Sequence, residues 1–464
     1  MNTDYDVLVI GAGPAGENAA DRAQSTGLKA AVIEAHLVGG ECSYYACMPS
    51  KGLLRPGEVL NAVGRVPGAA AAVTGSIDIE AALARRDSLS ANFDDSGQVG
   101  WLESEGIDLL RGHGRIVGER LVEVEAEDGS TVTYQAGKAV IIATGTGAAW
   151  PPIPGLDDIG AWDNRDITTA KEVPRRLVVL GGGVVGVEMA QAWKSLGTEE
   201  VTIIEAEERL LPREEPFVGK ELASAFERLG INLIVGVKMV AASREAADGP
   251  VTATLENGSL INGDELLVAV GRRPNTRDIG LETIGLEPGG YITVNDHMQT
   301  GPHPWLYAVG DVNGRALLTH TGKYQARVAG DHIAGKAENV TAYGDVKAIP
   351  RVIFTDPQIA AVGLTEAEAR KSHDQVSAVS YNIGHTAGAA TLGRGIRGTA
   401  QLVIDDADRV ILGATFIGPG AGELLHAATI AIIGGVTLDQ LWHAIPAFPT
   451  MSEVWLRFLE EYGL

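Results

Sequence analysis

Hydrophobic residues along the chain gather in short, β-rich runs that alternate with glycine turns and helical stretches. Residues 5–10 (YDVLVI) form the first such run, GAGPAG follows it, and a helical stretch continues to Ala23. A second run, AAVIE, ends at Glu34. The order strand, glycine turn, helix, strand is typical of a βαβ unit. The pattern therefore predicts an α/β fold at the start of the chain.

The same order recurs about 170 residues later. RLVVL at 176–180 is the predicted strand, GGGVVG at 181–186 is the turn, and VTIIE ends at Glu205. A single GxGxxG is weak evidence, because many turns contain glycine. Two copies, each with a strand, a helix and a distal acid, are strong evidence for two dinucleotide-binding units.

The rest of the chain divides into regions with different patterns of strands, helices and glycine turns. KAVIIATG (138–145) and LYAVGDV (306–312) each read as a strand followed by a small-residue turn, and WPPIPG (150–155) reads as a linker. From about residue 349, strands alternate with one apolar helix and the glycine fingerprint does not recur. This region predicts a third, α+β domain.

Composition narrows the class of protein. A length of 464 residues suggests roughly three domains, and 45% hydrophobic with 21% charged residues is ordinary for a globular chain. The net charge of −23 argues against nucleic acid and anionic membrane as partners. The N-terminus lacks the cations of a signal peptide and no apolar run reaches membrane-span length, so we expect a cytoplasmic protein that does not bind membranes.

The glycines of each turn have distinct tasks. Gly11 makes the turn, Gly13 lets a pyrophosphate approach the backbone, and Gly16 lets helix and strand pack closely. Glu34 lies 18 residues after Gly16 and can accept hydrogen bonds from a ribose diol. The corresponding residues of the second turn are Gly181, Gly183, Gly186 and Glu205.

The only cysteines, Cys42 and Cys47, are spaced C-x4-C. This is neither a zinc spacing nor a CxxC motif, and with no second pair we expect no metal site. Five residues of straight helix rise about 7.5 Å, whereas Cα atoms joined by a disulfide are rarely more than ~6.8 Å apart. A bridge here needs a distorted turn, which makes a disulfide more reducible. The pair is interpreted as redox-active; two inert buried thiols are the alternative.

The segment GGECSYYACMPSK (39–51) resembles the active-site segment of the flavoprotein disulfide reductases, the pyridine nucleotide-disulfide oxidoreductase family. Dihydrolipoamide dehydrogenase, glutathione reductase and mercuric reductase are members. The resemblance covers the whole chain and implies FAD at the first site, NAD(P)H at the second, and a homodimer. The implied fold has two Rossmann-like domains and an α+β dimerisation domain. Its implied domains are 1–150 (FAD, first part), 151–274 (NAD(P)), 275–348 (FAD, second part) and 349–464 (dimerisation).

The resemblance also implies residue roles. Cys47 corresponds to the charge-transfer thiol and Cys42 to the interchange thiol that attacks substrate. Lys51 corresponds to a lysine beside the flavin N5, with Glu188 as its ion-pair partner; a solvated helix lysine is the alternative for Lys51.

Asp311 corresponds to the acid that binds the flavin ribityl chain, although on spacing alone it could equally be a turn-forming aspartate. The remaining residues expected to line the two cofactor sites are Pro14, Ala15, Gly40, Glu41, Gly114, Thr144, Gly145, Val185, Gly271 and Gly310.

Glu205 bears on cofactor choice. A carboxylate at this strand end binds the ribose 2′-hydroxyl of NAD and repels a 2′-phosphate. Arg209 follows four residues later, and we expect it to face solvent. We therefore predict that NADH is preferred over NADPH.

The C-terminal segment departs from the family. The family pattern HPTxxE provides a histidine as general acid–base, and here Phe448 stands in its place while Glu453 is kept. Phenylalanine cannot move a proton, and losing such a group typically costs ~10²–10⁴-fold in rate. His443 is a possible substitute or a structural hydrogen-bonding residue, and Glu453 could serve if burial raised its pKa. Tyr44 and Tyr45, between the cysteines, are interpreted as packing residues.

These residues predict an enzyme that passes electrons from NAD(P)H through flavin and the cysteine pair to a small disulfide or thiol-reactive acceptor. Three alternatives stay open. Electrons could pass from flavin directly to a quinone, dye or metal ion. The chain could perform a reductive cleavage like that of 2-ketopropyl-coenzyme M oxidoreductase/carboxylase, which shares the phenylalanine but has histidine where this chain has Glu453. It could also be an electron-transfer component without turnover of its own.

Overall fold

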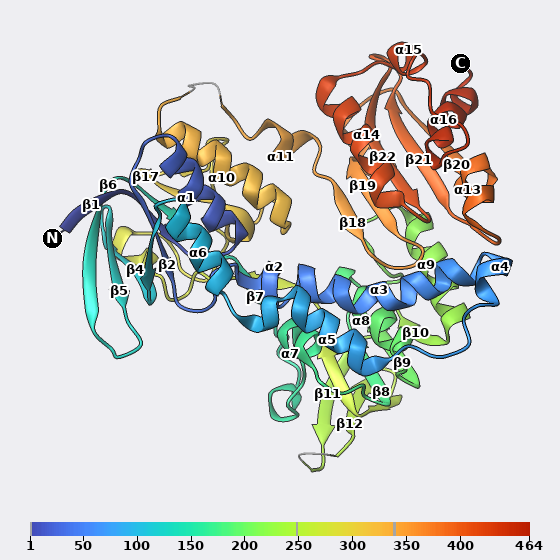
Figure 1. Cartoon of the computed structure of the whole chain (residues 1–464), viewed down its shortest axis with the longest axis horizontal. Coiled ribbons are helices and arrows are strands. Elements are labelled where there is room, and N and C mark those ends of the chain that lie inside the picture. Colours follow the sequence, from blue (N-terminus) through green and yellow to red (C-terminus); the bar gives the residue numbers. More distant parts are fainter. Residues whose placement is uncertain (1, 247–248, 337–339) are drawn as a thin grey trace. The chain divides into compact units, whose positions relative to one another are not determined.

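The computed structural model describes residues 2–246, 249–336 and 340–464. They form two compact units. Unit 1 comprises residues 1–49, 87–149 and 272–346, and unit 2 comprises 50–86, 150–271 and 347–464. In Figure 1 the blue, teal and yellow-orange segments of unit 1 share one sheet, so residues far apart in the sequence lie together there. The predicted boundaries at 150, 274 and 348 stay predictions.

Unit 1 is built on an eight-stranded sheet with the path β16-β17-β6-β1-β2-β3, to which β5 adds beside β6 and β4 beside β5. Strands β17, β6, β1, β2 and β3 are parallel. The strands are β1 (Asn2–Ile10), β2 (Ala30–Glu34), β3 (Asp108–Arg111), β4 (His113–Gly118), β5 (Leu121–Glu125), β6 (Thr131–Ile142), β16 (Gln299–Thr300) and β17 (His303–Ala308). A separate pair joins β7 (Thr146–Ala148) to β15 (Arg272–Pro274).

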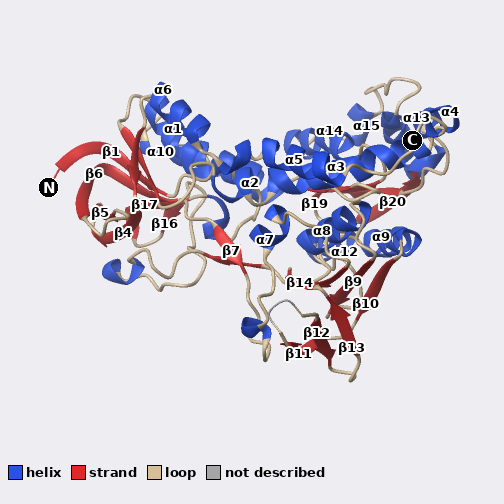
Figure 2. Ribbon diagram, turned by 60° about the horizontal axis from the view of Figure 1, so that its bottom comes forward, coloured by secondary structure: helices blue, strands red, loops and turns tan. Residues whose placement is uncertain are grey.

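The centre of this sheet is hydrophobic on both faces, as expected for parallel strands. Val7, Leu8 and Val9 of β1 have no exposed surface. The helices of unit 1 include α1 (Pro14–Ser25), α2 (Gly40–Tyr44), α6 (Ser96–Ser104) and α10 (Thr319–Ile333). Helices α1 and α10 pack side by side (Figure 2). The first glycine turn lies at the N-terminus of α1.

Three helices of the described chain cross the division between the units in sequence. Helix α3 (Cys47–Gly64) begins in unit 1 and passes into unit 2 after Pro49, and α5 (Ile79–Leu89) passes from unit 2 into unit 1 after Arg86. A short helix, α11 (Tyr343–Lys347), ends the last segment of unit 1.

Unit 2 contains the second βαβ arrangement. Its parallel sheet has the order β10-β9-β8-β14, and an antiparallel sheet β11-β12-β13 accompanies it. The elements are α4 (Pro67–Ala70), α7 (Asn164–Thr169), β8 (Arg176–Leu180), α8 (Val184–Ser195), β9 (Glu200–Glu205), α9 (Pro216–Leu229), β10 (Ile231–Val235), β11 (Met239–Arg244), β12 (Val251–Leu255), β13 (Leu260–Gly263) and β14 (Glu265–Val268).

The C-terminal part of unit 2 is a five-stranded antiparallel sheet in the order β18-β19-β22-β21-β20. Helix α14 packs on β19 and β22, and α16 packs on β20. The elements are β18 (Arg351–Ile353), β19 (Ile359–Gly363), α12 (Glu366–Ser372), β20 (Val376–Asn382), α13 (Ala387–Leu392), β21 (Thr399–Asp405), β22 (Val410–Ile417), α14 (Ala421–Gly434), α15 (Leu438–Leu441) and α16 (Val454–Tyr462).

Candidate functional site

The first glycine turn has the geometry of a phosphate-binding turn. Gly11 has φ +98°, and a Cβ on Gly16 would lie 1.9 Å from the carbonyl oxygen of Gly11. At Gly13 a Cβ would meet nothing within 4 Å, so the backbone there faces open space. Gly13 is the N-cap of α1 and makes no side-chain cap, while Pro14 opens the helix. Uncapped N–H groups at a helix N-terminus beside open space fit a phosphate group.

Glu34 is held at the end of β2 by two backbone donors. Its Oε2 accepts a hydrogen bond from the N–H of Ala12 at 2.7 Å, and its Oε1 accepts from the N–H of His36 at 2.8 Å. The carboxylate is therefore fixed beside the glycine turn, which is the position that recognises a ribose in a dinucleotide site.

The second glycine turn repeats these features in unit 2. Gly181 has φ +112°, a Cβ on Gly186 would lie 1.9 Å from the oxygen of Gly181, and Gly183 faces open space. Gly183 is the uncapped N-cap of α8, and Val185 in its first turn is partly exposed. The residues of both turns thus fit a dinucleotide.

Glu205 repeats the contacts of Glu34. It accepts hydrogen bonds from the N–H groups of Gly182, at 2.6 Å, and Glu207, at 2.8 Å. Arg209, expected to face solvent, is half-buried. Its guanidinium donates to the carbonyl oxygens of Leu211, Pro212 and Glu214, at 2.7–2.9 Å, because the loop after β9 folds back around it.

Asp311 lies just beyond β17 in unit 1. Its carboxylate accepts a 2.8 Å hydrogen bond from the hydroxyl of Thr146. Burial raises the pKa of Asp311, while the Thr146 hydrogen bond and the charge of Arg272 lower it. Arg272 donates to the carbonyl oxygen of Thr146 and lies 3.6 Å from Glu41. The site thus presents a half-buried carboxyl group, Asp311, near the guanidinium of Arg272, whose charge Glu41 partly balances.

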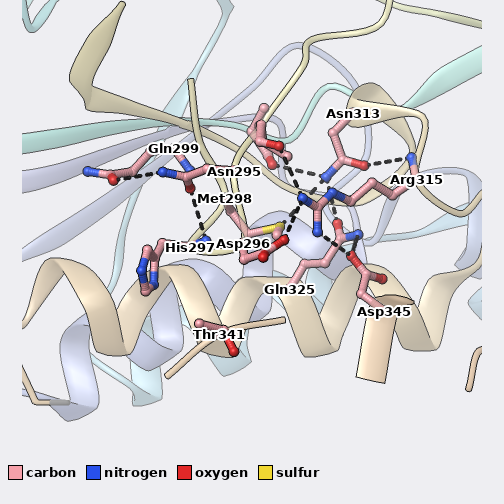
Figure 3. A network of polar contacts seen from close by, with 12 residues as sticks. Asn295, Asp296, His297, Met298, Gln299, Asn313, Arg315, Gln325, Thr341 and Asp345 are labelled. Carbon is pink, nitrogen blue, oxygen red and sulfur yellow. Dashed lines mark hydrogen bonds and ion pairs between the residues drawn. The ribbon is translucent and has the colours of Figure 1, made fainter. Parts of the chain in front are cut away.

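A buried polar network holds the backbone next to Asp311 (Figure 3). The Oε1 of Gln325 accepts from the N–H of Gly310 and from Nδ2 of Asn313, both at 2.8 Å. Its Nε2 donates to Oδ2 of Asp345 at 2.9 Å, and Arg315 approaches the same oxygen at 3.5 Å. Gln325 has no exposed surface. Because Asp345 accepts, the amide of Gln325 is oriented with its oxygen toward Gly310.

Two further predicted cofactor residues lie at the turn after β6. The hydroxyl of Thr144 donates to the carbonyl oxygen of Asn275 at 2.8 Å, and the Asn275 amide donates back to the Thr144 carbonyl at 3.0 Å. Gly145 follows with φ +67°. The exchange of hydrogen bonds fixes this turn against the segment that returns to unit 1.

Gly114 and Gly271 are the looser matches among the predicted cofactor residues. At Gly114 in β4, a Cβ would lie 2.9 Å from Cγ2 of Ile33, so close packing on β2 already requires glycine there. Gly271 has φ +137° and faces open space.

The cysteines lie where α2 ends and α3 begins, so the distorted turn expected between them is present. A Cβ on Gly40, the first residue of α2, would lie 2.9 Å from the Cα of Gly13, which places the segment against the first glycine turn. Both cysteines are present as thiols. The Cys47 Sγ lies 3.4 Å from the Thr319 hydroxyl at the start of α10.

The environment of Cys42 opposes its ionisation. A hydrogen bond with Cys47 raises the pKa of Cys42, and burial raises it further, while Thr319 and the charge of Lys323 lower it. Cys42 therefore favours the thiol form, and α10 supplies the two groups, Thr319 and Lys323, that lower its pKa.

The two tyrosines between the cysteines pack, as interpreted from the sequence. Tyr44 is fully buried and its hydroxyl donates to the carbonyl oxygen of Val38 at 2.9 Å. Burial raises its pKa to about 12. Tyr45 stacks on Phe93, with ring centroids 6.1 Å apart.

Lys51 and Glu188 form the predicted ion pair in unit 2. Lys51 Nζ lies 2.8 Å from Oε2 of Glu188, whose Oε1 accepts from the N–H of Phe354 at 2.9 Å. Glu188 is 3% exposed. The ammonium also lies 4.6 Å from the ring centroid of Phe354. The interpretation of Lys51 as a merely solvated lysine does not hold, because its ammonium has a buried carboxylate partner.

The C-terminal candidates for the missing acid–base group lie in unit 2. Phe448 is 79% exposed, and His443 is also exposed. Glu453 is buried, but the hypothesis that burial raises its pKa was wrong. Its carboxylate accepts hydrogen bonds from the N–H of Ala387 at 2.7 Å and from the guanidinium of Arg457 at 2.6 Å. These two hydrogen bonds lower its pKa. Glu453 is held as a carboxylate and has no proton to donate.

Sequence reasoning missed Thr319, Gln325, Asp345, Glu17 and Lys323. All belong to unit 1. Glu17 follows Gly16 directly, in the first turn of α1, where an acid is common because it stabilises a helix N-terminus. The others act on residues as much as 272 positions away, as Thr319 does on Cys47. Among the described residues, no cluster of histidine, cysteine and acid could hold a metal ion, and no helix is long and apolar enough to cross a membrane.

Comparisons with known proteins identify the family. Residues 5–329 match the model described as pyridine nucleotide-disulphide oxidoreductase, and 349–457 match its dimerisation domain. The chain belongs to this family. Its members bind FAD and use NAD(P)H, so the chain is a flavoprotein oxidoreductase of the disulfide reductase class.

Individual relatives span nearly the whole chain. A dihydrolipoyl dehydrogenase of Thermus scotoductus is 37% identical, covering 97% of this chain and 95% of that protein. A mercuric reductase of Staphylococcus aureus is 31% identical, covering 97% and 81%. Among solved structures, the HOCl-induced flavoprotein disulfide reductase RclA of Escherichia coli, as the Cu(II) complex of its C43S mutant, superposes with a TM-score of 0.86 at 25% identity, covering 99% of both chains.

Proposed function

We propose that this family member passes electrons from NADH, through FAD and the Cys42–Cys47 pair, to a small disulfide or other thiol-reactive acceptor. The observation that carries the proposal is the placement of both thiols beside the first glycine turn, with Cys47 against Thr319 at the start of α10. FAD, when bound, supplies the two-electron relay between nicotinamide and thiols. The protein positions the groups that exchange electrons and protons.

The residues have separate roles in this proposal. Gly11, Gly13 and Gly16 hold the FAD pyrophosphate, Glu34 its ribose and Asp311 its ribityl chain. Lys51, one turn after Cys47 in α3, is oriented by Glu188. Gly181, Gly183 and Gly186 hold NADH. Cys47 faces the cofactor and Cys42 attacks the acceptor.

The C-terminal domain supports a homodimer. Large apolar side chains lie exposed in one segment: Trp442 is 49% exposed, Ile445 89% and Phe448 79%. Leaving them in water costs roughly 25 cal/mol for each Å² that a partner would cover. Together with the match to a dimerisation domain, this favours a second copy of the chain as the partner.

An anaerobic titration of the holoenzyme with NADH tests the dithiol route. We expect a long-wavelength thiolate-to-flavin charge-transfer band at about one NADH per flavin. The Cys42→Ser variant should lose disulfide reduction while keeping flavin reduction by NADH. Bleaching of the flavin without the band, or a Cys42→Ser variant that keeps its activity, would contradict the route and support direct transfer to a quinone, dye or metal ion.

Restoring the family histidine tests what Phe448 limits. Phe448 is exposed in the single chain, so Phe448→His disturbs no packing within that chain. We expect faster reduction of lipoamide or glutathione disulfide. An unchanged steady-state rate on both disulfides would show that Phe448 does not limit the chemistry.

A further inference from the structure

A network of direct polar contacts in unit 1 joins the segment that carries the cysteines to Asp311. Glu41 is the residue before Cys42, and its Oε2 lies 3.6 Å from the guanidinium of Arg272. Arg272 donates from Nε to the hydroxyl of Thr146 at 3.0 Å and from Nη2 to the Thr146 carbonyl oxygen at 2.6 Å. The Thr146 hydroxyl donates to Oδ2 of Asp311 at 2.8 Å. All three stretches of unit 1 contribute to these contacts, which we call the Arg272 network.

Both ends of the Arg272 network adjoin the first glycine turn. A Cβ on Gly310, the residue before Asp311, would lie 3.0 Å from the Cβ of Ala15 in the first turn of α1. A Cβ on Gly40, the residue before the acid at the other end of the network, would lie 2.9 Å from the Cα of Gly13. The neighbours of both acids thus pack closely on the glycine turn and the helix turn that follows it, where the FAD of the proposed function binds.

The guanidinium fixes the direction of each hydrogen bond in the network. A guanidinium can only donate, so the Thr146 hydroxyl accepts from Arg272. A hydroxyl has a single proton, which therefore goes to Oδ2 of Asp311. Among the described residues, no other hydrogen bond reaches the Asp311 carboxylate. Its Oδ1 is thus left to accept a hydrogen bond from a ligand hydroxyl.

The two charged members of the network act on Asp311 in opposite directions. Burial is the main cause that raises the pKa of Asp311. The hydrogen bond from Thr146 and the charge of Arg272 lower that pKa, whereas the charge of Glu41 raises it. The carboxylate form of Asp311 therefore depends on the balance between a cation and an anion that lie 3.6 Å from each other.

Other ionisable side chains around Asp311 act elsewhere. They are Glu17 of α1, Arg273 of β15, His320 and Lys323 of α10, and Asp345 of α11. The charge of Lys323 lowers the pKa of Glu17, and Asp345 accepts a hydrogen bond from Gln325. Arg273 and His320 are exposed. The charges that shift the pKa of Asp311 are those of the Arg272 network.

We propose that Arg272 is a positioning residue for flavin binding, which directs the Thr146 hydroxyl to Asp311 and keeps that carboxylate an acceptor for the ribityl hydroxyls. Glu41, on the segment that carries the cysteines, opposes Arg272. This inference rests on the function proposed above, in which Asp311 binds the ribityl chain of FAD. The charge on the residue before Cys42 thus sets how firmly the enzyme holds its flavin at a given pH.

The rate of FAD release from the holoenzyme, followed across pH by the fluorescence of the freed flavin, tests the proposal. Release should accelerate as the pH falls and Asp311 takes up a proton, because a protonated carboxyl loses acceptor capacity. In Arg272→Met the acceleration should begin at higher pH, and at neutral pH release should be about tenfold faster than in wild type, the effect of one charge-assisted hydrogen bond. In Glu41→Gln it should begin at lower pH. Arg273→Met, which removes the same charge from the next residue of β15, is the matched control and should leave the profile unchanged.

Thr146 separates the hydrogen bond from the charges. Thr146→Val keeps the shape of the side chain but removes the hydroxyl that donates to Asp311. We expect release to accelerate at higher pH in this variant, as in Arg272→Met. Thr146→Ser keeps the hydroxyl and should follow the wild-type profile. A wild-type profile in Thr146→Val would show that the hydrogen bond does not hold Asp311 as an acceptor.

The Glu41→Gln variant keeps the proposal testable even if Arg272→Met fails to fold. Its expected result is slower release of flavin in acid, which damage to the fold cannot produce. Onsets that move in the same direction in the Arg272 and Glu41 variants, or that do not move, would overturn the proposed roles of these two residues.

Asp311→Asn separates this inference from the function on which it rests. The only oxygen of its amide accepts from Thr146, so the group left for a ligand hydroxyl is an NH₂ donor. We expect fast release without the acceleration in acid. An Asp311→Asn holoenzyme that releases FAD as wild type does at every pH would contradict the proposed contact of Asp311 with flavin. Fast release in Asp311→Asn with unmoved onsets in the Arg272 and Glu41 variants would overturn the further inference alone.

Discussion

Carboxyl groups in this chain differ in behaviour according to their hydrogen bonds and burial. Glu453 accepts from a backbone N–H and a guanidinium, which lower its pKa. Glu17 is half-buried, its Oε1 is buried without a partner among the described residues, and its pKa rises to about 7. Asp311 lies between these cases, since burial raises its pKa and Thr146 with Arg272 oppose the rise. The same residue type thus supplies a fixed anion in one place and a carboxyl with a raised pKa in another.

The hydrogen bonds of Glu453 predict a pH-dependent contribution to stability. Because the pKa of Glu453 in the folded chain lies below the ordinary glutamate value of about 4.3, the stabilisation is present above that pH and is lost as the pH falls through the folded pKa. We expect Glu453→Gln to lower the free energy of unfolding by about 1–2 kcal/mol at pH 7, and the difference from wild type to vanish in strong acid. Urea denaturation across pH measures it.

Glu460 offers the control for this prediction. It also pairs with Arg457, at 2.7 Å, but its side chain is 46% exposed. Glu460→Gln should cost much less, as exposed pairs do. An equal loss of unfolding free energy in the two variants would show that burial does not strengthen the hydrogen bonds of Glu453.

At the scale of elements, the two strand–turn–helix units are nearly matched. Each has an uncapped glycine N-cap, a tight contact between the first and third glycines, and a distal glutamate bonded to the turn. They differ in what surrounds them. The first turn lies against α2 and α10 of unit 1, while the second is followed by the loop in which Arg209 is tied to carbonyl oxygens.

This match supplies a control for cofactor choice. Glu205→Gln removes the charge that would repel a 2′-phosphate, and Arg209 is not available to bind one. We expect wild type to favour NADH over NADPH and the ratio of their kcat/KM values to fall about tenfold in Glu205→Gln, equivalent to about 1.4 kcal/mol. Glu34→Gln, the same change in the first turn, should leave the ratio alone. A ratio unaffected by Glu205→Gln would mean that another feature selects the cofactor.

The Gln325 network predicts that two substitutions compensate each other. Gln325→Glu places a second carboxyl against Asp345, where only one can ionise without cost, and we expect a loss of about 2 kcal/mol of stability with faster release of FAD. Adding Asp345→Asn provides an N–H donor for the new carboxylate and should recover much of the loss. The unfolding free energies of wild type, both single variants and the double variant give the coupling. Additive effects would contradict the donor–acceptor arrangement.

Local patterns predicted much of the fold, and long-range contacts set the limit. The strands β2 and β8 end at Glu34 and Leu180 as expected. A short hydrophobic run followed by a turn is a local pattern, which the sequence shows directly. The hydrogen bond of Gln325 to Gly310 depends on two amides meeting across a turn, and nothing in either segment announces it. Glu453 shows a different limit: its burial was foreseeable, but the two donors that reverse the effect of burial on its pKa were not.

At the scale of the whole molecule, each unit is assembled from three separate stretches of chain. Strand β17 pairs with β6 in unit 1, although about 160 residues lie between them. The flavin-binding residues proposed here are split in the same way, with Gly11 and Glu34 in the first stretch and Asp311 in the third.

Truncation tests this division. A chain ending at Gly271 keeps the first glycine turn and both cysteines but loses β17, Asp311 and Gln325, so we expect it to retain no flavin. A chain ending at Ala348 keeps every stretch of unit 1 and should retain flavin better. Absorbance of the purified proteins at the flavin band, per mole of chain, measures the difference. Equal flavin content would contradict the need for the third stretch.

The interleaving of the two units also sets an order of events during synthesis. Ribosomes add about 5–20 residues per second, and roughly 300 residues separate the end of the first stretch of unit 1 from the end of its third. About 160 of these residues lie between β6 and β17, so the nascent chain spends about 8–32 s with the edge of β6 waiting for β17. During that interval the first glycine turn and both thiols are already outside the ribosome. Flavin supply and reducing conditions thus matter before the polypeptide is finished, and cells that fall short of either should accumulate misfolded nascent chains rather than a stable apoprotein.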